Sequence, residues 1–153
     1  MEKIKEFKEF VVKDKSLALP YMRHGLIGTL KDLADLVRQK KEWCSQTAAH
    51  RFWDTMRFSI VTFEGIPLES APLDQIGYTI RTEEELALIL GVMNKLWKVM
   101  DVIGTEKPDA DYLNSPLWHD VVIASAKAYN YIKEKGLDSD YIEWLENLEP
   151  FLS

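Results

Sequence analysis

The stretch from Thr82 to Gly104, TEEELALILGVMNKLWKVMDVIG, constrains the fold more than any other part of the chain. Its apolar residues recur at alternating steps of three and four, which is the spacing of one helix face. Thr82 is followed three residues later by Glu85, as in a capping box. Gly104 can adopt the left-handed conformation that ends many helices. The recurring apolar residues are Leu86, Ile89, Met93, Leu96, Met100 and Ile103. The pattern predicts a helix near 83–103.

This helix has an unusually wide apolar face. Its apolar residues span roughly 200° of a helical wheel, against the stripe of about 100° that is typical of a helix lying on a surface. A face this wide must contact several neighbours, so we expect this helix to be central in a bundle. The segment contains no histidine or cysteine. It therefore predicts a fold and no chemistry.

Helical patterns recur through the rest of the chain. Residues 2–13 form an amphipathic pattern, and a second helix is expected from Pro20 to the cations at 38–41, with Val37 on its buried stripe. Ser115 and Pro116 have the cap-and-proline order of a helix start. That helix is expected to end at Gly136, and a last one to run from 138 or 139 to Pro150. We expect one all-α domain over 1–153, a bundle of five or six helices.

Residues 46–63 fit two kinds of secondary structure. Alternating apolar residues favour a strand, namely Met56, Phe58 and Ile60. A longer window has helical spacing, through Ala49, Trp53, Met56, Ile60 and Phe63. A lone strand would have no partner elsewhere in the chain, so we favour the helix. The following connection, 66–81, is interrupted by prolines and is expected to pack on the core through Leu68, Leu73 and Ile76.

Composition narrows the functional classes. The net charge is −6, which is atypical of a nucleic-acid-binding protein. No apolar run approaches the ~18 residues of a membrane span, and the N-terminal residues lack the apolar core of a secretion signal. The single Cys44 cannot form an internal disulfide. We therefore expect a cytoplasmic protein with no nucleic-acid or membrane partner.

The three histidines are the candidates for chemistry. His50 and Asp54 are four residues apart, a spacing that fits a metal or acid–base pair and equally an exposed row of charges. His24, next to Arg23, fits an anion site at a helix start or only a bent start. In a helical bundle His24, His50 and His119 can converge as metal ligands. The hypothesis of a metal-dependent enzyme depends on these isolated residues, because no His-x-x-x-His or Glu-x-x-His pair is present. We expect no cofactor.

Two surfaces are candidates for binding a protein partner. Aromatic residues on more than one face of 46–63, notably Phe52 and Phe58, suit docking or homodimer formation. Residues 45–153 carry 9 Lys/Arg against 18 Asp/Glu, and the last helix is especially acidic. Its candidate partner-binding residues are Asp138, Asp140, Glu143 and Glu146. The sequence favours a non-enzymatic binding protein with an acidic surface, such as an immunity or inhibitor protein for a basic partner. A self-associating helical subunit is the alternative.

Overall fold

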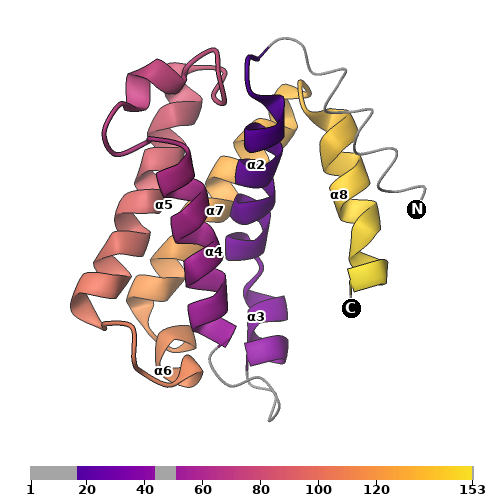
Figure 1. Ribbon diagram of the computed structural model, residues 1–153. Coiled ribbons are helices and arrows are strands. Elements are labelled where there is room, and N and C mark those ends of the chain that lie inside the picture. Colours follow the sequence, from indigo (N-terminus) through magenta and orange to yellow (C-terminus); the bar gives the residue numbers. More distant parts are fainter. Residues whose placement is uncertain (1–16, 44–50, 153) are drawn as a thin grey trace.

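The computed structural model describes residues 17–43 and 51–152 (Figure 1). These ranges contain α-helices, one short 3₁₀ helix (η1) and no β-strand, so the predicted all-α bundle is confirmed. The elements are α2 (Pro20–Ala34), α3 (Leu36–Trp43), α4 (Arg51–Gly65), η1 (Pro72–Gln75), α5 (Glu83–Val102), α6 (Asp109–Leu113), α7 (Pro116–Lys135) and α8 (Ser139–Leu152). The helix expected at 2–13 lies outside the described residues. None of the described helices has an apolar stretch long enough to cross a membrane.

The core lies where α5 and α2 both pack along α7, with α4 against α2 (Figure 1). The predicted helix near 83–103 is confirmed as α5, and it has several neighbours. It packs on α7 and η1, and Trp97 meets Phe63 of α4 edge-on, with ring centroids 6.4 Å apart. The buried apolar residues of α5 are Leu86, Ile89, Val92, Met93, Leu96 and Val99. Because α7 contacts both α2 and α5, it shares the centre of the bundle with α5.

The predicted helix ends are formed by the expected residues. The Thr82 side chain accepts a hydrogen bond from the Glu85 backbone N–H at 3.1 Å, and the Ser115 hydroxyl accepts one from Leu117. Gly136 ends α7 with a φ of 72°, a left-handed conformation that glycine adopts without strain. These local signals depend only on neighbouring residues, which is why the sequence predicts them well.

The second predicted helix is divided in two at Asp35. The Asp35 carboxylate accepts a hydrogen bond from the Arg38 backbone N–H at 3.0 Å and thereby starts α3. The Gln39 amide donates to the carbonyl oxygens of Asp32 and Leu33, which satisfies two acceptors at the end of α2. The break changes the direction of the following side chains. Val37, expected on the buried stripe, is 80% exposed.

Three further expectations concern α4, the connection after it and the last helix. Residues 51–65 are helical, so the strand alternative for 46–63 is wrong where the chain is described. Leu68 is buried, but Leu73 is 66% exposed because it lies on the outer side of the 3₁₀ turn. The last helix continues past Pro150 to Leu152. A proline there removes only one hydrogen bond of a final turn.

Candidate functional site

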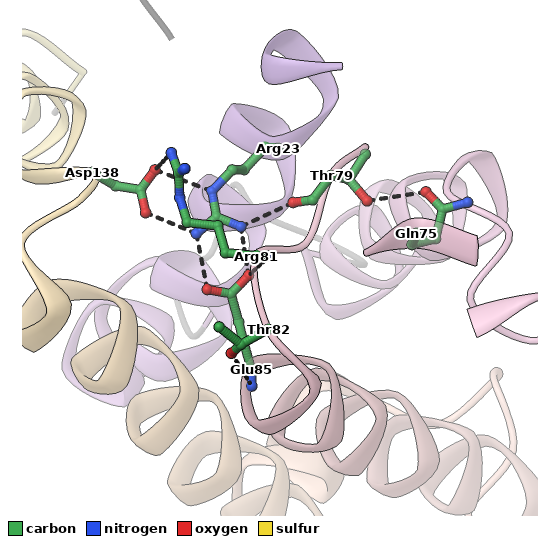
Figure 2. A network of polar contacts seen from close by, with 7 residues as sticks. All are labelled: Arg23, Gln75, Thr79, Arg81, Thr82, Glu85 and Asp138. Atoms are coloured by element: carbon green, nitrogen blue, oxygen red, sulfur yellow. Dashed lines mark hydrogen bonds and ion pairs between the residues drawn. The ribbon is translucent and has the colours of Figure 1, made fainter. Parts of the chain in front are cut away.

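Four charged side chains meet at one end of the bundle, and we call them the arginine cluster: Arg23, Arg81, Glu85 and Asp138 (Figure 2). Arg23 is completely buried. Its Nε and Nη2 donate to the two carboxylate oxygens of Asp138 at 3.0 and 2.7 Å. Nη1 and Nη2 donate to the two oxygens of Glu85, and Nη1 also donates to the carbonyl oxygen of Thr79 at 2.9 Å. All five N–H groups of this guanidinium are therefore used.

The charges of the arginine cluster balance. Arg81 Nη2 donates to Asp138 at 3.1 Å, so two guanidinium groups face two carboxylates. Burial by itself lowers the pKa of Arg23, but the hydrogen bonds and charges of Glu85 and Asp138 outweigh it and raise this pKa above its ordinary value. The hydrogen-bond donors of Arg23 are all engaged, and both carboxylates accept hydrogen bonds from arginine. The role of the cluster is to join the first turns of α2 and α5 to the start of α8.

The structure excludes the anion-site alternative at Arg23 and shows that the surface predicted for Asp138 is wrong. Arg23 is not part of an open anion site, because it is enclosed by two carboxylates. Asp138 is only 5% exposed and does not belong to an acidic surface. Glu146 is exposed but forms an ion pair with Lys133 at 2.7 Å. The acidic face of α8 is thus reduced mainly to Asp140 and Glu143, both of which are exposed.

We expect the arginine cluster to make the free energy of unfolding decrease at low pH. Burial by itself raises the pKa of Asp138, but the hydrogen bonds and charges of Arg23 and Arg81 outweigh it and lower the net pKa. The stabilisation is present above the unfolded pKa of about 3.9 and is lost as the pH falls through the lower folded pKa. Urea unfolding between about pH 2 and pH 7 should show this loss, and Asp138→Asn should flatten it. The exposed neighbour Asp140→Asn is the control. Equal acid slopes for wild type and Asp138→Asn would contradict the prediction.

The structure does not bring His24 and His119 together. His24 is buried and stacks on Tyr141, with ring centroids 4.1 Å apart, and its carbonyl oxygen accepts a hydrogen bond from the Tyr141 hydroxyl at 2.9 Å. His119 lies in the first turn of α7, and its Nε2 is 2.7 Å from the carbonyl oxygen of Leu113. His24 lies near the opposite, C-terminal end of α7, because its neighbour Arg23 binds Asp138, three residues after that helix ends. The length of α7 therefore separates the two histidines by roughly 24 Å at 1.5 Å per residue.

The other predicted site residues are not tested by the structure. His50 and the side chain of Asp54 lie outside the described residues. The same holds for the side chains of Phe52 and Phe58, although both belong to α4. Among the residues that are described, no group of three or more His, Cys, Asp and Glu side chains is placed to hold a metal ion. Self-association through α4 stays a prediction.

A hollow between α4 and α5 combines acidic and apolar lining residues, and we call it the acidic groove. It has a volume of about 370 Å³ and is lined by Ile60, Glu64, Glu69, Trp97, Met100 and Asp101. The three carboxylates are exposed, and none forms an ion pair with another described residue. No lysine or arginine is among the described lining residues. The groove thus offers negative charge beside half-buried apolar surface.

The sequence contains a signal for the acidic groove in the spacing of its acidic and apolar residues. Glu64 lies four residues after Ile60, and Asp101 lies four residues after Trp97. On a helix this spacing places each carboxylate beside the apolar side chain that precedes it by one turn. Two such pairs on consecutive long helices indicate an acidic edge along both. Only the packing of α4 near α5 joins these edges into one groove.

One comparison with known families gives a match. A family model described as "Domain of unknown function (DUF7945)" matches residues 17–140, which is most of the chain. The chain belongs to the DUF7945 family. No curated protein and no solved structure matches the chain. The DUF7945 match includes all residues of the arginine cluster and of the acidic groove, whereas Glu143 and Glu146 of α8 lie beyond it. The groove therefore lies within the family's domain, and most of α8 does not.

Proposed function

We propose that this DUF7945 protein is a non-enzymatic binding module that receives a basic protein partner in the acidic groove. The observation that carries the proposal is a set of three carboxylates, none paired with another described residue, around the floor of Trp97 and Met100. A cytoplasmic immunity or inhibitor protein that covers a basic surface of its target would act in this way. The single cysteine and the net charge of −6 are consistent with that setting.

The chemistry of the acidic groove fits a lysine or arginine side chain. Such a side chain has an apolar stem that can lie on apolar surface while its charged end reaches a carboxylate. Trp97 is half-buried in the groove, and an indole ring also attracts a cation over its face. Met100 adds a flexible side chain that adapts to different shapes. Three carboxylates with no lysine or arginine among the described lining residues also attract a basic partner from a distance, most strongly at low salt.

The proposal predicts that groove charges matter more than α8 charges. We would titrate the protein with a short fluorescent peptide rich in arginine and lysine at about 20 mM salt, where screening is weak. The double variant Glu64→Gln/Asp101→Asn should weaken binding about fivefold, since exposed charge pairs contribute about 0.2–1 kcal/mol each. The control Asp140→Asn/Glu143→Gln removes the same charge from α8 and should stay within about twofold of wild type.

Two results would contradict the proposed function. One is an equal loss of affinity in both double variants, because binding would then follow net charge alone. The other is a wild-type protein that does not bind the basic peptide even at low salt. An acidic peptide of the same length serves as the negative probe and should show no binding.

A further inference from the structure

A second hollow lies close to the acidic groove, and we call it the apolar pocket. It has a volume of about 490 Å³. Its lining is mostly apolar but includes the exposed acidic residue Asp74, together with Leu19, Met22, Gly65, Pro67, Ala71, Gln75 and Tyr78. Two of its walls are joined by a backbone hydrogen bond, from the Leu19 N–H to the Tyr78 carbonyl oxygen at 2.9 Å. The pocket is thus formed by the start of α2 and the connection between α4 and α5.

Exposed apolar side chains gather around this pocket. Leu19 is 42% exposed and Tyr78 is 51% exposed, and both line it. Leu73, in the adjoining 3₁₀ helix, is 66% exposed. Single exposed apolar residues are common on proteins, but a group of them around a hollow is typical of a binding site. A volume of about 490 Å³ lies within the range of natural ligand pockets.

Gln75 supplies a polar group beside Asp74 in a lining that is otherwise mostly apolar. Its residue is only 8% exposed, and its Oε1 accepts a hydrogen bond from the Thr79 hydroxyl at 3.0 Å. Its amide nitrogen makes no hydrogen bond to another described residue, and Figure 2 shows that nitrogen on the side away from Thr79. This nitrogen is not among the buried polar atoms that lack a partner, so it reaches solvent and can donate to an acceptor on a bound molecule in place of water. A peptide carbonyl group is such an acceptor.

The apolar pocket and the acidic groove share one short segment of chain. Glu64 lines the groove and the next residue, Gly65, lines the pocket. Further along, Glu69 lines the groove, whereas Pro67 and Ala71 line the pocket. A partner bound in the groove therefore has its neighbouring residues within reach of the pocket.

We infer that the apolar pocket receives a large apolar side chain of the same basic partner, with a partner carbonyl group accepting a hydrogen bond from Gln75 Nε2. This inference rests on the proposed function, because it takes the occupant of the groove as given. It adds that the partner carries an aromatic or branched aliphatic residue close to its lysine or arginine. Charge then brings the partner to the groove, and apolar burial selects it.

Two probes test the inference: a basic peptide with one phenylalanine near its arginines, and the same peptide with serine in that place. The phenylalanine peptide should bind wild-type protein about tenfold more tightly, as expected for burying one large apolar side chain. Ala71→Phe, which fills the pocket, should abolish this preference and leave the salt dependence unchanged. Tyr78→Ser, at the exposed rim, should reduce it. Ala87→Phe, the same substitution on an exposed position of α5, is the matched control and should have no effect.

The outcomes separate this inference from the proposed function. Equal affinities of the two basic peptides, or an unchanged preference in both Ala71→Phe and Tyr78→Ser, would overturn the inference and leave the groove proposal standing. Failure of both peptides to bind wild-type protein at low salt would overturn the proposed function itself. An uncharged phenylalanine peptide that binds as tightly as the basic one would overturn the link between pocket and groove.

Discussion

Replacing Arg23 with methionine is expected to destabilise the protein by about 3–5 kcal/mol, because breaking a buried ion pair leaves its partners charged and unpaired. Arg23 is completely buried. Its removal would leave the Glu85 carboxylate without its arginine partner and would remove both hydrogen bonds that Asp138 accepts from Arg23. Lysine should not rescue the variant, since an ammonium group cannot make two bidentate contacts at once. Urea unfolding at neutral pH measures the effect. A loss below about 1 kcal/mol would show that the cluster is not important for stability.

Two control variants test whether the expected loss of stability comes from unpaired buried charge. Arg38→Met is the same substitution at a partly exposed arginine that pairs with Glu42 at 3.0 Å, and it should cost at most about 1 kcal/mol. The double variant Arg23→Met/Glu85→Gln removes one charge of each sign and leaves Arg81 paired with Asp138. It should recover part of the stability lost in Arg23→Met, because the cost arises from buried charge and not from lost volume. No recovery would point to packing as the cause.

Replacing Trp118 with alanine is expected to cost about 3–5 kcal/mol, the usual loss when a large aromatic residue is removed from a core. Trp118 is completely buried at the start of α7, and its indole N–H donates to Gln39 Oε1 at 2.8 Å. The Gln39 amide in turn holds the end of α2 through the carbonyl oxygens of Asp32 and Leu33. The variant therefore opens a cavity and also releases the residue that stabilises the break between α2 and α3.

The size of the side chain and its hydrogen bond can be separated. Trp118→Phe keeps most of the apolar volume and loses the N–H, so we expect a smaller cost of about 1–3 kcal/mol. Trp97→Ala, at a half-buried tryptophan, should cost less than Trp118→Ala. Thermal unfolding followed by circular dichroism compares the three variants. Equal losses for Trp118→Ala and Trp97→Ala would contradict the placement of Trp118 in the core.

The sequence predicts those parts of the fold that depend on neighbouring residues. Thr82, Ser115 and Gly136 mark helix ends through local capping, and the apolar spacing of α5 fixes its length. The break at Asp35 could not be predicted in this way. It depends on the Asp35 carboxylate, which cannot be told from an ordinary surface carboxylate in the sequence. It also depends on Gln39, whose side chain accepts a hydrogen bond from Trp118, a residue far away in the sequence.

The arginine cluster was missed for a similar reason. Its members lie far apart in the sequence, and charged residues are ordinarily assigned to the surface. A signal did exist: Arg23 lies on the same helical stripe as Leu26 and Leu30, and Glu85 lies on that of Ile89. A charge on a buried stripe indicates a buried partner of opposite sign, but the sequence does not say which one. Asp138 directly precedes the acidic helix α8, so charge alone predicts a surface position, whereas its pairing with Arg23 and Arg81 buries it.

Chemical-shift mapping tests the central claim, that a basic partner binds between α4 and α5, most directly. Isotope-labelled full-length protein would be titrated with the basic phenylalanine peptide at low salt. The account predicts that the Trp97 indole N–H and the backbone amides of 60–71 and 97–101 shift first. Shifts centred on α8 around Asp140 and Glu143, or no shifts at saturating peptide, would contradict it.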